Sequence, residues 1–164
     1  MLLYHQPDKE AKMFIPNPVF FYQLFFYITR PKTRRLIKRL EDHARSWPYL
    51  SIKTHALGGR EFDLNGDEVA HVHWNGDLNI LFKKELVHEL LRQNLAGRHR
   101  FVPGHAVTYT IKDGSGLDAA VDLLRLSYLI HVRMAVKSDP ELKAVNDRQL
   151  SELPYDRQIL NLIL

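Results

Sequence analysis

Length, composition and charge limit the kinds of protein that this chain can be. It has 164 residues, which favours one domain with a single core, and its 45% hydrophobic and 26% charged residues are ordinary for a globular protein. It has no cysteine, which excludes disulfides, iron–sulfur clusters, zinc–thiolate sites and cysteine nucleophiles. The net charge of +4 is concentrated in residues 30–45, where seven Lys and Arg side chains accompany only Glu41 and Asp42. The basic character is therefore a local patch.

The first 30 residues form a leader with an aromatic, apolar segment. Residues 1–12 are polar and lack the layout of a secretory signal. The segment that follows, FIPNPVFFYQLFFYI, is interrupted by Pro16 and Pro18 and is shorter than the roughly 20 residues that cross a bilayer. Two interpretations are open, a helix packed on the domain or an interfacial anchor at an anionic membrane. We expect a cytoplasmic protein without a signal peptide or transmembrane helix, either free or peripheral to the membrane.

A basic helix is expected over residues 31–46. Pro31 stands near its start, and apolar residues recur at helical spacing from Leu36 to Trp47. Its remaining face is cationic and is formed by Arg34, Arg35, Lys38, Arg39 and Arg45. Such a face is either simply solvated or binds the phosphate groups of lipid or nucleic acid. No aromatic RNA-binding motif or zinc finger accompanies it, so specific nucleic-acid recognition is not expected.

Residues 59–82 are predicted to form three antiparallel strands, preceded by a first strand in YLSIKTHAL. Asn65-Gly66 and Asn75-Gly76 lie between strand-like runs, and Asn-Gly favours the positive φ angles of a two-residue hairpin turn. Such turns would pair Leu64 with Asp67, Phe62 with Val69 and Arg60 with His71 across the first turn, and His73 with Leu78 and His71 with Ile80 across the second. One face, predicted to be the core face, then holds Arg60, Phe62, Leu64, Val69, His71, His73, Leu78, Ile80 and Phe82. The other face, which includes Asn79, is mostly acidic and is expected to meet water.

His71 and His73 are the candidate site residues. They stand two residues apart on one predicted strand, and hence roughly 6.5–7 Å apart on one face. Two neutral imidazoles there can bind a divalent metal, with a third ligand from His99, His105 or His55. The alternatives are two partly buried core histidines or a polar pocket without metal.

The second half of the chain adds a helix over residues 83–96, a strand over 105–111 and a long helix from about Leu117 to Ala135. Residues 136–164 are charged, contain two prolines and end in ILNLIL. An apolar terminus must be covered either by its own domain or by a partner subunit, which leaves a homo-oligomer open.

The series of elements from about residue 33 to residue 131 resembles the bacterial luciferase-domain-containing proteins. The resemblance is carried by SWPYLSIKTHALGGREF, EVAHVHWNGDLNILF, a helix leading to RHRF, then VTYTI and LLRLSY. The residues that match the family signature are Glu68, His71, His73 and Gly76, with His99 matching a histidine that follows the next helix in many members. One common form of the motif has a further histidine where this chain has Asn79. The chain does not look like the large light-emitting oxygenases, so luminescence is not expected.

These patterns predict an α+β fold, with an antiparallel sheet of about five strands covered by helices on one face. The expected order is α-α-β-β-β-β-α-β-α plus a C-terminal tail, divided into a leader (1–30), a domain (31–135) and a C-terminal extension (136–164). Three functions are open: a small-ligand or accessory binding module with a histidine-lined pocket, a metal- or histidine-dependent enzyme of unknown reaction, or a peripheral protein that binds anionic lipid or nucleic acid.

The candidate residues fall into three groups. Those of the pocket are His71, His73, His99, Glu68 and Arg60. Those for a divalent metal, the one cofactor considered, are His71, His73 and His99. Those for an anionic surface are Arg34, Arg35, Lys38 and Arg39.

Overall fold

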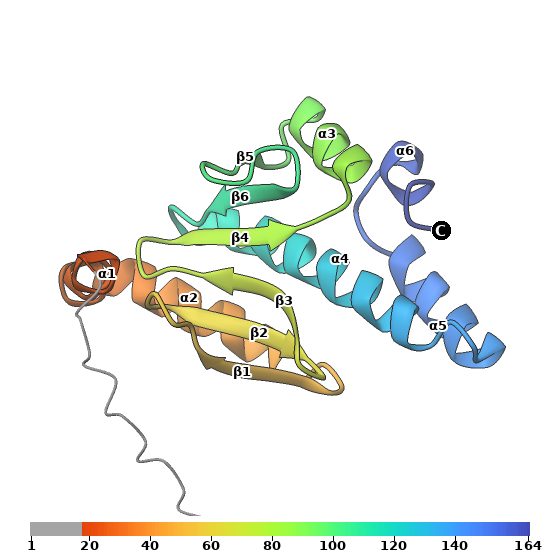
Figure 1. Cartoon of the computed structure of the whole chain (residues 1–164), viewed down its shortest axis with the longest axis horizontal. Coiled ribbons are helices and arrows are strands. Elements are labelled where there is room, and N and C mark those ends of the chain that lie inside the picture. Colours follow the sequence, from red (N-terminus) through yellow and green to blue (C-terminus); the bar gives the residue numbers. More distant parts are fainter. Residues whose placement is uncertain (1–17) are drawn as a thin grey trace, which may run out of the picture.

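The computed structural model describes residues 18–164, and the expectations for residues 1–17 lie outside the described part. The elements follow one another as α1 (Pro18–Thr29), α2 (Pro31–Ala44), β1 (Leu50–Thr54), β2 (Arg60–Leu64), β3 (Asp67–Val72), β4 (Asp77–Leu81), α3 (Lys84–Arg92), β5 (Gly97–Arg98), β6 (Ala106–Thr110), the 3-10 helix η1 (Gly114–Gly116), α4 (Leu117–Ala135), α5 (Pro140–Ser151) and α6 (Arg157–Leu160) (Figure 1).

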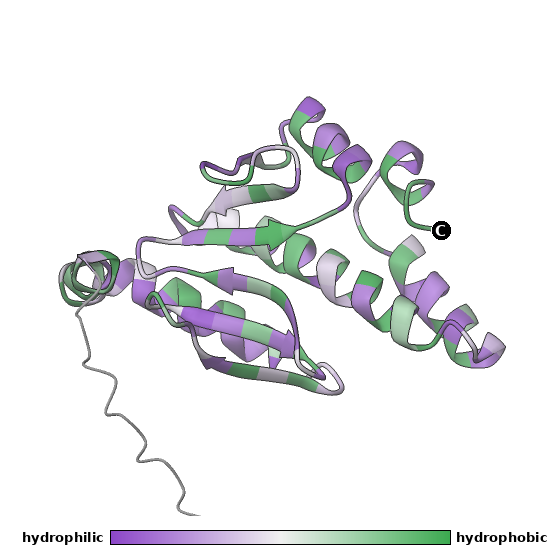
Figure 2. Ribbon diagram, viewed as in Figure 1, coloured by the Kyte–Doolittle hydropathy of each residue, from purple (hydrophilic) through white to green (hydrophobic). Residues whose placement is uncertain are grey.

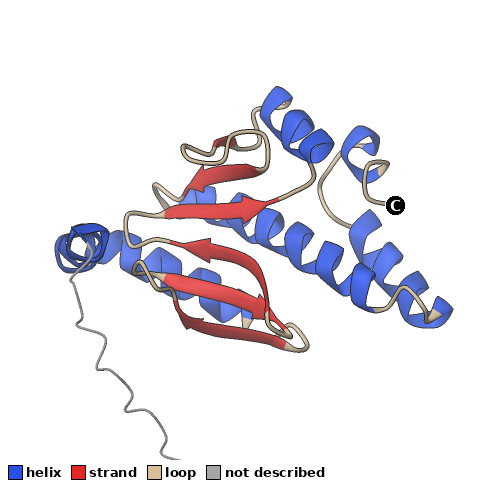
Figure 3. Cartoon of the chain, viewed as in Figure 1, coloured by secondary structure: helices blue, strands red, loops and turns tan. Residues whose placement is uncertain are grey.

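A single twisted sheet organises the described residues. Within residues 18–164 it has six antiparallel strands in the order β1-β2-β3-β4-β6-β5 (Figure 3). The predicted α+β class with an antiparallel sheet is therefore confirmed. The strand absent from the prediction is β5, whose Gly97 and Arg98 pair with Thr108 and Val107. Two residues are too few to show the alternation by which strands are found in a sequence.

The core lies between one face of the sheet and the helices α2 and α4, which run behind it in Figure 1. Hydrophobic and hydrophilic residues alternate along the strands, as expected of a sheet with one covered face (Figure 2). Fully buried side chains come from both layers: Ile37 and Leu40 of α2, Leu117 and Leu124 of α4, and Phe62, Val72 and Leu78 of the strands. The opposite sheet face has no helix over it in the described chain, and this face carries the histidines.

The first hairpin has the predicted turn but not the predicted register. Leu64 pairs with Asp67, and Asn65 (φ 55°) and Gly66 (φ 97°) both have the positive φ that a two-residue turn requires. Beyond them, β3 contains a bulge, because Asp63 pairs with Glu68 but Phe62 pairs with Ala70. The residue between, Val69, is the extra one. The expected pairs of Phe62 with Val69 and of Arg60 with His71 are wrong; Glu61 is opposite His71 and Arg60 is opposite Val72.

A buried hydrogen bond from α4 holds this bulge. Val69 and Ala70 are both buried although they are consecutive. The Val69 carbonyl, displaced from the ladder, accepts a hydrogen bond from Ser127 Oγ at 2.8 Å, and Ser127 is fully buried. This hydrogen bond pairs the Val69 carbonyl and the Ser127 hydroxyl, two buried polar groups that each need a partner in the core.

The second hairpin is one residue longer than expected. The N–H of His73 donates to the Asp77 carbonyl at 2.9 Å, so that three residues, Trp74 to Gly76, form the loop. Gly76 has φ 99°, but Asn75 uses its side chain instead of a positive φ, because its Oδ1 accepts the Asp77 N–H at 3.1 Å. The extra residue changes the partners across the turn. His71 lies opposite Asn79 and Val72 opposite Leu78, in place of the predicted His71–Ile80 and His73–Leu78 pairs.

The two shifts place the histidines on the face opposite to the predicted one. His71 and Asn79 lie side by side on the open face, while Phe62, Val72 and Leu78 face the helices. Asn79, expected to point away from His71, is its neighbour. Arg60 points the other way, and its Nε donates to Glu41 Oε1 of α2 at 3.0 Å. Arg60 is therefore not part of a pocket with the histidines.

The C-terminal residues pack on their own chain. Leu150 of α5 and Ile159 of α6 have no exposed surface and belong to the main core. Asp156 caps α6 and also accepts a hydrogen bond at 2.8 Å from Gln93, the residue that follows α3. Leu162 and Leu164 stay about half exposed. Of the helices within residues 18–164, none has the length and apolar character to cross a membrane.

Candidate functional site

The site starts from a chain of hydrogen bonds across three strands of the open face. Thr108 Oγ1 of β6 donates to Asn79 Oδ1 at 2.7 Å, and Asn79 Nδ2 of β4 donates to His71 Nε2 at 3.1 Å. His71 Nδ1 of β3 donates to Glu68 Oε1 at 2.5 Å. In this arrangement His71 Nδ1 carries a ring proton and Nε2 accepts the Asn79 amide. The hydrogen bond from His71 lowers the pKa of Glu68, which is a carboxylate at neutral pH.

The Val69 bulge is what makes the Glu68–His71 contact available. In a regular strand, residues three apart point to opposite faces. The extra residue adds one step to the alternation, so that Glu68 and His71 share the open face. The backbone thus fixes which carboxylate orients the histidine.

Two more imidazoles stand against His71. His55, from the loop between β1 and β2, stacks on His71 with ring centroids 4.3 Å apart and planes inclined by 12°. The His73 ring is 4.8 Å from that of His71 and 5.2 Å from that of His55, and its Nδ1 donates to the Gly58 carbonyl at 3.0 Å. Burial lowers the pKa of both His55 and His73, and the proximity of His71 adds to this. Both rings are neutral at pH 7, and His73 keeps the lone pair of Nε2.

A small cavity opens beside this cluster. It has a volume of about 250 Å³; its polar wall is made by Glu68, His71, Asn79 and His99, and its apolar wall includes Val102. His99 lies in the loop after β5, and its Nδ1 accepts the N–H groups of Phe101 at 3.2 Å and Val102 at 3.1 Å. The neutral His99 ring therefore carries its proton on Nε2. Burial lowers the pKa of His99 as well.

Of the residues suggested by the sequence, the structure brings Glu68, His71 and His99 around one cavity. His73 touches His71 without lining that cavity, and His55 completes the cluster. His105 lies elsewhere, in a larger and mostly apolar hollow of about 800 Å³ between β4, α4 and the C-terminus. Sequence reasoning missed the roles of Asn79 and Thr108, because Asn79 comes opposite His71 only when the second hairpin has a three-residue loop.

The cations predicted to face anionic surfaces are divided by the structure. Arg34 turns back to α1, where it donates to the Tyr27 carbonyl at 2.8 Å, and Lys38 is ion-paired with Asp42. Arg35 and Arg39 are exposed and have no hydrogen-bond or ion-pair partner within residues 18–164.

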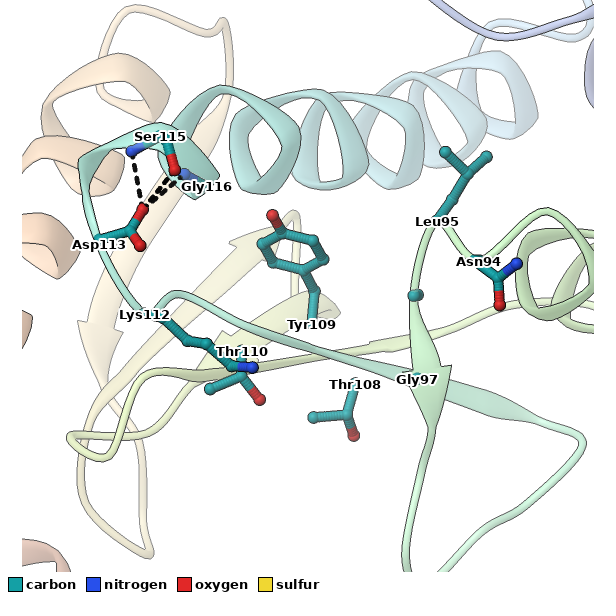
Figure 4. Close-up of a pocket in the computed structure, with 11 residues that line it drawn as sticks. Asn94, Leu95, Gly97, Thr108, Tyr109, Thr110, Lys112, Asp113, Ser115 and Gly116 are labelled. Atoms are coloured by element: carbon teal, nitrogen blue, oxygen red, sulfur yellow. Dashed lines mark hydrogen bonds between the residues drawn. The ribbon is translucent and has the colours of Figure 1, made fainter.

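A third hollow, of about 490 Å³, lies where β6 runs into η1 (Figure 4). Tyr109, Lys112 and Asp113 line it. Asp113 is engaged in local hydrogen bonds, because its Oδ1 accepts the N–H and the hydroxyl of Ser115 and the N–H of Gly116. No histidine lines this hollow among the described residues. The histidine cluster is therefore the stronger candidate for chemistry.

The structure defines an α+β protein with a polar, histidine-bearing sheet face. Comparison with family models assigns part of it: residues 66–127 match the family described as Luciferase domain. Residues 66–127 are therefore similar to a luciferase domain, in agreement with the resemblance seen in the sequence. The match runs from the first turn into α4 and includes Glu68, His71, His73, Asn79 and His99, whereas His55 precedes it. Comparison with curated proteins and with solved structures gave no match.

The lowered histidine pKa values predict a pH-dependent stability of the metal-free, chelator-treated protein. A histidine in the unfolded chain has a pKa of about 6.5, whereas those of His55 and His73 are lower in the folded protein. As the pH falls below 7, the unfolded chain therefore takes up protons before the folded protein does. The free energy of unfolding should therefore fall from pH 7.5 towards the lower folded-state pKa values. The slope is at most about 1.4 kcal/mol per pH unit for each histidine. Urea unfolding at several pH values measures this slope of unfolding free energy against pH. The double variant His55→Asn/His73→Asn should have a shallower slope than wild type. The control His88→Gln, which changes an exposed residue of α3, should have the wild-type slope. Equal slopes in all three proteins would contradict the prediction.

Proposed function

We propose that this protein is a binding module that holds a divalent transition-metal ion between His55, Glu68 and His71, with the neighbouring cavity receiving a small ligand. One observation carries the proposal: each of the three residues offers a ligand atom, and these atoms all lie within 4.8 Å of one another. Two imidazoles and a carboxylate are a donor set that zinc and similar ions use in proteins.

The chemistry of the donors supports a borderline divalent cation. Nitrogen and carboxylate ligands suit zinc, cobalt, iron or manganese, and the chain has no thiolate that would select a softer ion. Ligand atoms about 2.0–2.2 Å from a tetrahedral ion lie roughly 3.5 Å from one another, so the widest pair must close by roughly 1 Å. Rotation of His55 can supply this closure, because the hydrogen bond from the Leu57 N–H to its Nδ1 is long, at 3.3 Å.

The hydrogen-bond chain can orient a metal-bound His71. An ion at Nδ1 replaces the proton shared with Glu68, so that the ring proton moves to Nε2. If the Asn79 amide turns over, its oxygen accepts this proton and its nitrogen donates to Thr108 Oγ1. Ligating histidines commonly make such a second hydrogen bond, which fixes the ring. The cavity beside Asn79 and His99 would then admit a small ligand with an oxygen or nitrogen donor as a further ligand to the ion.

Titration of the chelator-treated protein with Co²⁺ tests the proposal, with visible absorption and bound metal as readouts. Wild type should bind one equivalent, and His71→Ala and Glu68→Gln should each bind at least about tenfold more weakly because each loses a ligand. His99→Ala should bind Co²⁺ normally, because His99 lines the cavity without belonging to the three-residue cluster. Acetohydroxamate, a small chelating ligand, should then change the Co²⁺ spectrum of the wild type.

The His99→Ala control distinguishes the proposed His55–Glu68–His71 site from a metal site that includes His99. If wild type binds no stoichiometric Co²⁺, or if His99→Ala weakens binding as much as His71→Ala, the His55–Glu68–His71 site is wrong. Circular dichroism and urea unfolding of each variant show that a loss of binding is not a loss of fold.

A further inference from the structure

The helix α1 has an apolar surface that the described residues, 18–164, leave exposed. It has no charged residue, and only Gln23 and Phe26 are buried. Phe25 remains 59% exposed and Ile28 66% exposed. The exposed apolar side chains of α1 are Val19, Phe20, Phe21, Tyr22, Leu24, Phe25, Tyr27 and Ile28. So large a patch on one short helix marks a surface that binds something.

Few contacts join α1 to the sheet, and they involve one side of the helix. The Tyr27 ring meets Trp74 edge-on at 4.8 Å, and Gln23 lies against Gly58 so closely that a Cβ on Gly58 would be 2.8 Å from Gln23 Cβ. α1 therefore projects beyond the sheet at the end that carries the loop of the second hairpin (Figure 1).

A row of unpaired cations continues from this helix. Lys32, Arg35 and Arg39 stand three and four residues apart on α2 and so share one face, opposite the buried Ile37 and Leu40. All three cations are exposed and lack a hydrogen-bond or ion-pair partner within residues 18–164. An uncharged, aromatic-rich helix and an outward cationic row therefore follow each other directly in the chain.

We infer that α1 and this cationic row dock the protein on an anionic lipid bilayer. At about 1.5 Å per residue, the 12 residues of α1 reach about 18 Å, too short for a hydrocarbon core of about 30 Å, so α1 lies in the interface. Phenylalanine and tyrosine suit that depth, and the cations meet the lipid phosphates. A second copy of the chain fits less well, because two α1 helices in contact would bring two cationic rows together.

Vesicle flotation of the full chain tests this inference. The protein should float with phosphatidylcholine vesicles that contain phosphatidylglycerol, much less with pure phosphatidylcholine, and less as salt is added. Phe21→Ser/Phe25→Ser should lose binding, since each exposed ring contributes more than tenfold. Lys32→Gln/Arg35→Gln/Arg39→Gln should bind about a hundredfold more weakly, because each cation near an anionic surface contributes roughly fivefold.

A charge-matched variant controls for a simple effect of net charge. Lys83, Lys84 and Lys137 are exposed. They adjoin the start of α3 and the end of α4, which lie away from α1 (Figure 1), so their substitution by Gln should leave binding within a few-fold of wild type. Equal losses in the two triple variants would overturn the inference in favour of non-specific attraction. Failure to float, together with a dimer that Phe21→Ser/Phe25→Ser converts to a monomer, would overturn it in favour of self-association. Neither result depends on metal binding, which is measured separately.

Discussion

Replacing Gly59 with alanine is expected to lower the free energy of unfolding by about 3–5 kcal/mol, a large part of the stability of a small domain. A Cβ at this position would lie 2.0 Å from the Val72 carbonyl oxygen and 2.9 Å from the His73 Cα, both backbone atoms that cannot step aside. Gly59 also has φ 110°, a conformation that residues with a side chain rarely adopt. The chain there must separate from β3, which would disturb the His73 contact with the Gly58 carbonyl.

Gly66→Ala is the matched control for this substitution. Gly66 has φ 97°, but no atom lies within 4 Å of the position that its Cβ would take. Only backbone strain is left, and we expect a loss of about 1 kcal/mol. Urea unfolding of both variants measures the difference. Equal losses would show that the close approach of Gly59 to β3 is not what demands glycine.

Replacing Ser127 with alanine is expected to cost about 1–3 kcal/mol of stability, because the Val69 carbonyl would remain buried without a partner. Ser151→Ala removes a similar side-chain to backbone bond, from Ser151 Oγ to the Arg148 carbonyl, but at an exposed position, and should change stability by no more than about 0.5 kcal/mol.

The Ser127 variant should also disturb the site, although the Ser127 side chain contacts neither Glu68 nor His71 and its hydroxyl bonds only the Val69 carbonyl. Without the anchor, the bulge that aligns Glu68 with His71 is weakened. The proton of their 2.5 Å hydrogen bond should give a strongly downfield NMR signal in the wild type and a shifted or absent signal in Ser127→Ala. An unchanged signal would mean that the bulge persists without the serine.

Elements with strong local patterns could be predicted from the sequence. The long helix from Leu117 to Ala135 and the basic helix beginning at Pro31 agree with the structure because each shows many turns of helical periodicity. The two Asn-Gly pairs had different outcomes. Asparagine makes a turn either by adopting positive φ, as Asn65 does, or by accepting a backbone N–H with its side chain, as Asn75 does. The dipeptide alone does not say which.

Only part of the candidate site could be predicted from the sequence, because the rest depends on the strand register. The spacing of His71 and His73 indicated a shared face, but the choice of face depended on the register. The sequence does not reveal a bulge when the extra residue and the next one are both apolar. Val69 and Ala70 are such a pair, and both are buried. Ser127, which reveals the bulge, is 58 positions away in the chain. The second loop has a separate effect: with two residues it would turn Asn79 away from His71, whereas with three it places Asn79 opposite His71, to which its Nδ2 donates.

The site divides into a rigid part and an adaptable part. Glu68, His71 and Asn79 project from the strands β3 and β4, where a change of position would have to move the sheet. His55 and His99 come from loops, which tolerate changes of length and sequence. Variants of this protein could thus acquire a new preference for ion or ligand by altering the two loops, while the strand residues and the core behind them stay as they are.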